Sequence, residues 1–365
     1  MNISQIQTIP EVINVLKVLI TGVLAFLLAF SITPLWTKFL YKKKFGIKIK
    51  KTSVSGEKLT YVSKLHASKS GTPTMGGFIV WISVFILVIM SHYIFPLLAD
   101  LFNVDFIARL DFLSRPQVWL PLFALVAAGI LGLFDDVMSI RGWGSNKGGG
   151  MRFAMRFWWL FLIAFLGAWW FYYKLGWDLL HIPAVGDFSI GLWYIPLFIF
   201  VILFTAISSN ETDGLDGLNG GILFMAFSSF AVITFLQNKV DLSAFCAAVS
   251  GALLAFLWFN IYPARFFMGD TGAVSLGTTL GVVAMLSNSV LVLFILVFVY
   301  VLESASVAIQ LTSKKFFGKK VFLAAPLHHH FEALGWPEPK VTMRAWIFTI
   351  LMSIIGVIIG ILGMD

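Results

Sequence analysis

The feature that most constrains this chain is a series of apolar stretches, most of them long enough to cross a bilayer as a helix. A transmembrane helix needs roughly 20 mainly apolar residues. Ten such stretches follow one another along the chain, with the third and fourth the shortest. They cover residues 13–36, 76–95, 118–134, 157–173, 192–209, 218–236, 242–262, 272–288, 290–312 and 343–363. The sequence therefore predicts an all-α integral membrane protein with ten transmembrane helices, forming one polytopic domain over residues 1–365.

The composition excludes a soluble protein. Hydrophobic residues make up 59% of the chain and charged residues 12%, against about 45–50% and about 25% in soluble domains. The net charge of +8 does not indicate nucleic-acid binding, because a basic binding face needs a water-soluble body to carry it. The single cysteine, Cys246, lies in an apolar run, so it reads as a small buried hydrophobe and no disulfide framework is possible.

The basic residues predict how the chain is oriented in the membrane. All but five of the 26 lysines and arginines lie in segments that follow odd-numbered stretches. The exceptions are Lys17, Arg109, Arg115, Lys174 and Lys239. Because cytoplasmic loops carry the excess of positive charge, these segments should face the cytoplasm and both termini should lie outside it.

Five segments are too polar, or too rich in glycine and proline, to be simple connectors. They comprise residues 66–77, 134–136, 210–218, 260–270 and 326–332. Each follows an odd-numbered stretch and so falls on the predicted cytoplasmic side. The orientation rests on lysine and arginine alone, so this coincidence is separate support for a functional site on that face.

Aspartates are the most informative residues of these segments. Five of them lie at the cytoplasmic ends of apolar stretches: Asp135, Asp136, Asp213, Asp216 and Asp270. A carboxylate at membrane depth is costly unless it is paired, hydrated or bound to metal, and neighbouring carboxylates repel one another without a cation nearby. Oxygen ligands of this kind suit Mg²⁺. For any single aspartate, a solvated helix cap is an equally good interpretation.

The spacing of Asn210, Asp213 and Asp216 would place them on one helix face if the sixth span begins there as a helix. Lys69 precedes small, flexible residues whose backbone N–H groups could approach a phosphate, although the G-K-[ST] ending of a Walker A loop is missing. Three further basic residues fit either a phosphate contact or a purely topogenic charge: Arg152, Arg156 and Lys147, the last of which lies outside the residues that the structure describes.

Three consecutive histidines, His328, His329 and His330, first suggest zinc. Neighbouring helical residues point about 100° apart and no H-E-x-x-H spacing exists, so hydrogen bonds to a phosphate or within a loop are favoured. Glu303 is an isolated acid within the ninth stretch, for which a buried hydrogen bond or a helix break is favoured over a proton pathway. The GxxxG spacings at 277–281 and 356–360 favour internal packing, and residues 181–191 could form a small hairpin.

The five segments, in their order and spacing, resemble the polyprenyl-phosphate N-acetylhexosamine-1-phosphate transferase superfamily. Within it the chain is similar to the phospho-N-acetylmuramoyl-pentapeptide-transferase family over essentially its whole length. The most specific parts are residues 66–77, 210–218, 267–270 and 326–332. The flanked triple histidine separates this family from the GlcNAc-1-phosphate branch. The stretch between Asp136 and Phe157 is less typical, so either Arg152 or Arg156 can stand where the family has a functional lysine.

The resemblance implies transfer of phospho-MurNAc-pentapeptide from UDP-MurNAc-pentapeptide to undecaprenyl phosphate. The products would be lipid I and UMP, in the first membrane step of peptidoglycan synthesis. It further implies a homodimer in the bacterial inner membrane, with periplasmic termini and Mg²⁺ as cofactor. An alternative within the superfamily is transfer of GlcNAc-1-phosphate from UDP-GlcNAc. An ion-coupled transporter is a more distant alternative, because Glu303 has no deep partners and no symmetric halves are visible.

The resemblance also implies roles for individual residues. Asp270 would bind Mg²⁺ and Phe267 would stack on uracil. The implied catalytic residues are Lys69, Asp135, Asp136, Asp213, Asp270 and His328. The implied substrate contacts are Thr74, Arg156, Asn210, Asp216, Asn260, Phe267, Gly269, His329 and His330. Direct attack of the lipid phosphate is favoured over a covalent phospho-aspartate, since a phosphate monoester with a second pKa of about 6 is already largely ionised at pH 7.

Overall fold

The computed structural model describes residues 10–46, 69–114, 117–144 and 149–363, and nearly all of its regular elements are helices. The helices are α2 (Pro10–Lys42), α4 (Phe78–Phe102), α5 (Asp105–Ala108), α6 (Trp119–Arg141), α7 (Phe153–Trp169), η2 (Trp170–Lys174), η3 (Gly191–Trp193), α8 (Tyr194–Thr212), α9 (Leu218–Leu236), α10 (Val240–Asn260), α11 (Asp270–Leu286), α12 (Val290–Leu296), α13 (Phe298–Phe317), α14 (Leu327–Ala333) and α15 (Glu338–Leu362). The predicted hairpin is confirmed as two antiparallel strands, β1 (Leu179–Ile182) and β2 (Gly186–Ser189).

Eight helices in the described ranges are long and apolar enough to span a membrane, and a ninth span results if α12 and α13 are counted together. These two helices meet at Val297 with a bend of 80°. The eighth predicted stretch corresponds to α11, which has only 17 residues. Every residue of α11 after Asp270 is buried, so neighbouring helices enclose it and it need not match the bilayer thickness. An integral membrane protein is therefore supported, with eight or nine long apolar helices.

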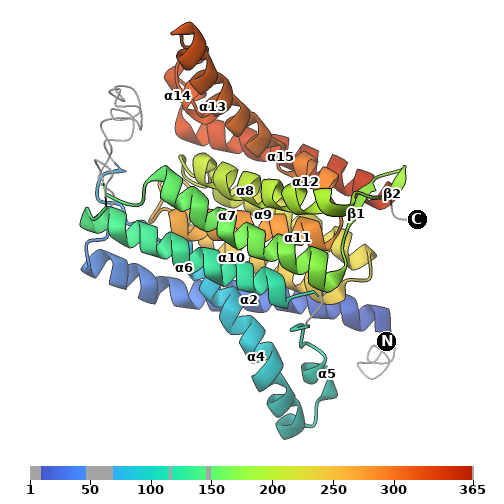
Figure 1. Ribbon diagram of the computed structural model, residues 1–365. Helices are drawn as coiled ribbons and strands as arrows, with labels where there is room; N and C mark the ends of the chain where they lie inside the picture. Colours follow the sequence, from blue (N-terminus) through green and yellow to red (C-terminus); the bar gives the residue numbers. More distant parts are fainter. Residues whose placement is uncertain (1–9, 47–68, 115–116, 145–148, 364–365) are drawn as a thin grey trace.

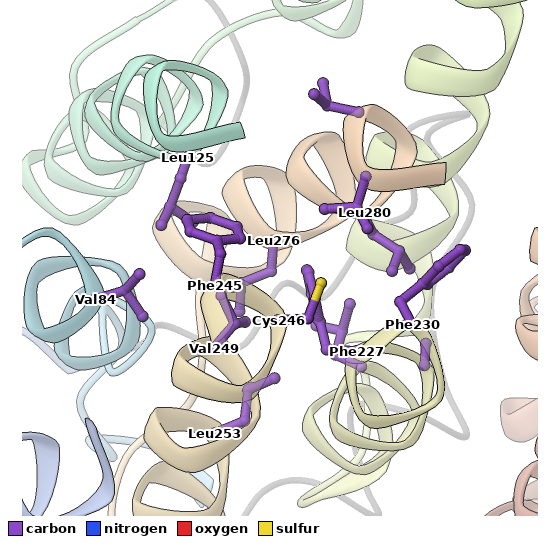
Figure 2. Packing of buried hydrophobic residues seen from close by; sticks show 14 of the residues in the cluster. Val84, Leu125, Phe227, Phe230, Phe245, Cys246, Val249, Leu253, Leu276 and Leu280 are labelled. Atoms are coloured by element: carbon purple, nitrogen blue, oxygen red, sulfur yellow. The ribbon is translucent and has the colours of Figure 1, made fainter. Parts of the chain in front are cut away.

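Most helices lie side by side, with α11 inside the bundle (Figure 1). It packs against α6 and α8, while α10 packs against α2 and α9. Side chains of five helices meet in the core, as Figure 2 shows for Val84, Leu125, Phe230, Phe245 and Leu276. Cys246 is buried among them, as the sequence predicts. By contrast α4, and the pair α13 and α14, diverge from the bundle.

Both GxxxG spacings serve packing within the chain. Cβ atoms at Gly277 and Gly281 would lie 2.5 Å and 2.7 Å from atoms of Thr205, so α11 approaches α8 closely. Gly356 and Gly360 of α15 likewise lie against side chains of α12 and α9. The predicted internal role of these small residues is confirmed.

The two ends of the bundle carry different groups. At one end Lys17 near the start of α2 forms an ion pair with Asp241 at 2.7 Å, and Gly363 after α15 lies against Pro183 of the hairpin. The described chain thus begins and ends on the same side (Figure 1). The end of α6, the end of α8 and the start of α11 lie at the opposite end, where the predicted site residues gather.

Candidate active site

Arg156, in the first turns of α7, is the centre of a polar cluster formed by four helices. Its guanidinium donates to Asn210 Oδ1 in the last turn of α8 at 2.9 Å. It also forms ion pairs with Asp270 Oδ2 at 2.7 Å and with Asp135. Asn210 in turn donates to Asp270 Oδ1 at 2.5 Å. One cation therefore holds the end of α6, the end of α8 and the start of α11 together.

Two further carboxylates are bound to the backbone at the start of α11. Asp136 accepts the N–H groups of Asp270 and Thr271 at 3.2 Å and 3.0 Å. Asp213, the residue after α8, accepts the Gly269 N–H at 3.1 Å. The first N–H groups of a helix lack partners within the helix and attract negative charge. These aspartates therefore fix the position of the Asp270 side chain.

The segment after Lys69 pairs with the segment before α11 through backbone hydrogen bonds. Phe267 N donates to Pro73 O at 2.8 Å, and the N–H groups of Gly76 and Gly77 donate to residues 267 and 268. Gly269 follows with a φ of +74°. A Cβ there would lie 2.5 Å from Thr74 Oγ1 and 2.7 Å from Asp136 Oδ2, so both the backbone conformation and the space require glycine.

A second cation cluster surrounds Lys69. Its Nζ donates to Asp216 Oδ1 at 2.6 Å and to Glu338 Oε1 at 2.5 Å. Glu338, the first residue of α15, also accepts the Asp216 N–H at 2.6 Å, and Asp216 accepts the Ala264 N–H at 2.9 Å. The Lys69 Nζ lies 5.5 Å from the centroid of the Phe267 ring. This cluster connects three loops to the start of α15.

The histidine segment forms α14 beside α13. His328 is buried; Glu303 Oε2 accepts its backbone N–H at 3.2 Å and lies 3.1 Å from its Nδ1. His329 Nδ1 lies 2.8 Å from Glu332, and His330 Nδ1 accepts the Leu323 N–H at 3.2 Å. The buried hydrogen bond favoured for Glu303 is confirmed. The alternative, a helix break at Glu303, is not found there, because the bend lies at Val297.

Asp213 lies between the two cation clusters. Burial is the main cause that raises the pKa of its carboxyl to about 7. The hydrogen bond from the Gly269 N–H and the charge of Lys69 oppose this rise, and the carboxylates of Asp270 and Asp216 add to it. A carboxyl group in this state changes its charge near neutral pH. The pKa of Asp213 thus depends on charges from both clusters, Asp270 from one and Asp216 and Lys69 from the other.

The donor set fits Mg²⁺ that arrives with a phosphate ligand. No three His, Cys, Asp or Glu side chains in the described ranges are arranged to hold a metal alone. Mg²⁺ is usually bound by one or two carboxylates, with water and substrate phosphates completing the octahedron. Both oxygens of Asp136 accept backbone N–H groups, whereas those of Asp270 contact the side chains of Asn210 and Arg156, which can turn away. Asp270 is therefore better placed as a ligand than Asp136, and Asp213, which accepts the Gly269 N–H through Oδ2, lies nearby.

Residues 118–288 match the family described as Glycosyl transferase family 4. Relatives named phospho-N-acetylmuramoyl-pentapeptide-transferase match almost the whole chain. The one from Chloroflexus aurantiacus is 36% identical over 95% of this chain and 90% of its own length. Those from Clostridium botulinum and Geobacillus sp. are 34% and 33% identical, over 96% and 93% of this chain and 98% and 96% of their own lengths.

The chain belongs to the phospho-N-acetylmuramoyl-pentapeptide-transferase family. It is a transferase and a multi-pass membrane protein, as the sequence predicts.

The structure brings most of the predicted site residues of this family member together. One group comprises Asp135, Asp136, Asn210, Asp213, Gly269, Asp270 and Arg156; the other comprises Lys69, Asp216 and Phe267. Of the two candidate arginines, Arg156 lies in the cluster, whereas Arg152 is exposed just before α7. Thr74 lies beside Gly269.

Other predicted residues are placed differently. Asn260 is buried, accepts the Gly217 N–H at 3.0 Å and donates to Phe266 O at 2.8 Å, so it holds two loops together. Asn210, Asp213 and Asp216 would share one helix face only if a helix began there, and that condition is not met because α9 begins at Leu218. Asn210 lies in the last turn of α8, whereas Asp213 and Asp216 lie in the turn before α9, because Asp213 leaves the helical conformation with a ψ of 47°. His329 contacts Glu332 within α14, and His330 accepts the Leu323 N–H from the chain just before that helix.

One polar residue of the site was missed by the sequence analysis. Glu338 binds both Lys69 and the Asp216 backbone, yet in sequence it is a lone acid before the last apolar stretch. Its neighbours Pro337 and Pro339 mark a helix start, which explains the acid as a favourable N-terminal charge. Only the fold shows that this acid faces Lys69.

Proposed function

We propose that this chain transfers phospho-MurNAc-pentapeptide from UDP-MurNAc-pentapeptide to undecaprenyl phosphate, yielding lipid I and UMP. The observation that carries the proposal is the Arg156 cluster, in which Asp135, Asn210 and Asp270 meet at one end of an apolar bundle. Membership of the family supports the substrates. A polar cluster at the membrane surface suits a reaction between a water-soluble nucleotide sugar and a lipid.

The main obstacle to this reaction is repulsion between two anionic substrates. Phosphoryl transfer depends chiefly on positioning and on stabilising charge, and Arg156 supplies a fixed cation among the aspartates. Asn210 and Arg156 hold the Asp270 carboxylate in one orientation. Mg²⁺, when bound at Asp270, supplies further positive charge to the diphosphate and to the departing UMP. Phe267, beside Lys69, offers a ring face to the uracil.

We infer direct attack on the β-phosphorus. A bond forms from an acceptor phosphate oxygen to the β-phosphorus, and the bond from that phosphorus to the bridging oxygen breaks, so UMP leaves with the electron pair. The acceptor is already largely ionised at pH 7, so no aspartate has to remove a proton. Asp136 is engaged with backbone N–H groups, which favours a positioning role for it. A phospho-aspartate route would instead release UMP without a lipid acceptor.

We further propose ten transmembrane spans, with the short enclosed α11 as the additional one. The site would face the cytoplasm and both termini the periplasm of a bacterial inner membrane. The distribution of lysine and arginine supports this orientation, as does the placement of both chain ends opposite the aspartates. We also expect a homodimer, which the mass of the protein in detergent micelles would test.

The deciding experiment measures UMP release by the purified protein with Mg²⁺ and undecaprenyl phosphate. UDP-MurNAc-pentapeptide should be consumed and UDP-GlcNAc should not. Consumption of UDP-GlcNAc instead would contradict the proposed substrate and favour the GlcNAc-1-phosphate alternative. UMP released without the lipid acceptor, or a phosphorylated aspartate trapped under those conditions, would contradict direct attack.

A further inference from the structure

Glu303 and His328 form a buried pair that the proposed reaction does not yet use. They lie on α13 and at the second residue of α14, and both side chains are almost completely buried. A single oxygen, Glu303 Oε2, contacts the His328 backbone N–H at 3.2 Å and Nδ1 at 3.1 Å. Two bonds to one oxygen fix both the backbone and the rotation of the ring.

This contact determines which ring nitrogen is available. A carboxylate only accepts hydrogen bonds, so Nδ1 must carry a proton, and Nε2 is the nitrogen left for another partner. Nε2 is buried and has no hydrogen-bond partner in the described part of the chain. It lies against Gly214, where a Cβ would collide with it. The ring therefore points at the turn that carries Asp213 and Asp216.

The helix that carries Glu303 is itself joined to α8. Ser304, the next residue, lies 2.7 Å from Ser208 Oγ and donates to Glu211 Oε2 at 3.0 Å. Ser208 and Glu211 lie near the end of α8, just before the turn that His328 faces. The position of α13 is thus set by the same helix that presents Asn210 and Asp213, so Glu303 aligns the histidine with that turn.

We propose that Glu303 is a positioning residue of the transferase, holding His328 in one rotation and one tautomer so that Nε2 can hydrogen-bond the bound substrate beside the 213–217 turn. A buried polar atom without a partner is costly, and a substrate hydroxyl or phosphate oxygen would remove that cost. In acyl-transfer triads a carboxylate orients a histidine in the same way. The inference rests on the proposed function.

The test is a double-mutant cycle on UMP release with Glu303→Gln, His328→Ala and the double variant. We expect Glu303→Gln to lower kcat/KM roughly 10- to 100-fold, the range for removing a carboxylate that orients a metal-bound histidine, because an amide can donate as well as accept and no longer enforces one tautomer of the ring. The double variant should be no slower than His328→Ala, because Glu303 acts through the ring. Full activity of Glu303→Gln, or additive losses, would overturn the inference.

Gln310→Ala is the matched control, since Gln310 on the same helix holds the backbone of Val321 and Phe322 instead of the ring. Any loss of activity caused by Gln310→Ala should add to the loss caused by His328→Ala. If Glu303→Gln does not fold, Glu303→Asp replaces it in the cycle.

Imidazole ¹⁵N shifts of the wild type give a second readout: His328 must be protonated at Nδ1, and a ring protonated only at Nε2 would refute the proposal. An inactive wild type would instead refute the proposed function.

Discussion

Two clusters of similar composition lie side by side in this protein and differ in what surrounds them. Arg156 pairs with Asp135 and Asp270, and Lys69 pairs with Asp216 and Glu338. In the first cluster the Arg156 and Asp270 side chains are each 23% exposed and that of Asp135 is 2% exposed. In the second, the side chains of Lys69, Asp216 and Glu338 are 15%, 3% and 9% exposed. Both acids of the Lys69 cluster accept backbone N–H groups, as Asp135 does in the Arg156 cluster; the contrast therefore lies in the more exposed pair of Arg156 and Asp270.

The difference in exposure indicates that the Arg156 cluster contacts substrate and that the Lys69 cluster stabilises the loops around it. An accessible cation and carboxylate can exchange partners with a substrate, whereas a buried pair bound to the backbone mainly holds its loops. Removing one member of a buried pair is strongly destabilising, while a change at the accessible pair should affect the reaction first. The predictions that follow separate these two roles.

The largest effect is expected from Asp270→Asn. This change removes one negative charge while keeping the shape of the side chain, so Asn210 and Arg156 lose their charged partner but retain contact. We expect UMP release to fall about 10³-fold, as for other lost electrostatic contacts in active sites. The free energy of unfolding should change little. A large fall in the free energy of unfolding with little loss of UMP release would contradict the substrate-binding role of the Arg156 cluster.

Gly269→Ala should be the next most harmful change. The added methyl group would press against Thr74 and Asp136 at a residue with positive φ, which displaces the start of α11. A displacement of about 1 Å can cost about 10²-fold in rate. Gly71→Ala is the control, since Gly71 also has positive φ but a Cβ there meets nothing within 4 Å. Equal rates of UMP release for the two variants would refute this account.

Glu338→Ala tests the Lys69 cluster. It leaves Lys69 with one carboxylate and the Asp216 N–H without its acceptor. Because Asp216 still neutralises the lysine, we expect the free energy of unfolding to fall by about 2 kcal/mol. This is less than the about 3–5 kcal/mol expected when a buried ion pair loses a partner and leaves an uncompensated charge. Denaturant titration in detergent micelles measures it. Unchanged stability with a large loss of activity would show that this cluster, too, handles substrate.

The smallest effect concerns Asp213, between the clusters. Its pKa rises from 3.8 in the unfolded chain to about 7 in the folded protein. The folded state then binds this proton more tightly, so raising the pH from about 4 to 7 destabilises the protein. Asp213→Asn can still accept the Gly269 N–H but does not titrate. The thermal unfolding midpoint of this variant should fall less than that of the wild type between pH 5 and pH 8. If the midpoints of the two proteins change equally with pH, the raised pKa of Asp213 is contradicted.

Much of the site was predictable because its residues lie in motifs at the ends of apolar stretches. Asp135 and Asp270 follow from that position alone. The bend at Val297 does not follow from the sequence, since residues 290–303 contain no proline or glycine and are predicted as one continuous span. The Lys69–Glu338 pair joins residues 269 positions apart, a distance that no local pattern reveals. The choice between Arg152 and Arg156 likewise needed the packing of α7 against α8.

Those two arginines provide the most direct test of the central claim, that the Arg156 cluster is where the transfer takes place. They lie one helical turn apart and carry the same charge, but only Arg156 contacts Asp135, Asn210 and Asp270. The measurement is the initial rate of UMP release from UDP-MurNAc-pentapeptide for Arg156→Ala and Arg152→Ala. The account predicts a loss of about 10²-fold or more for the first and an unchanged rate for the second. Equal rates for the two variants would contradict it.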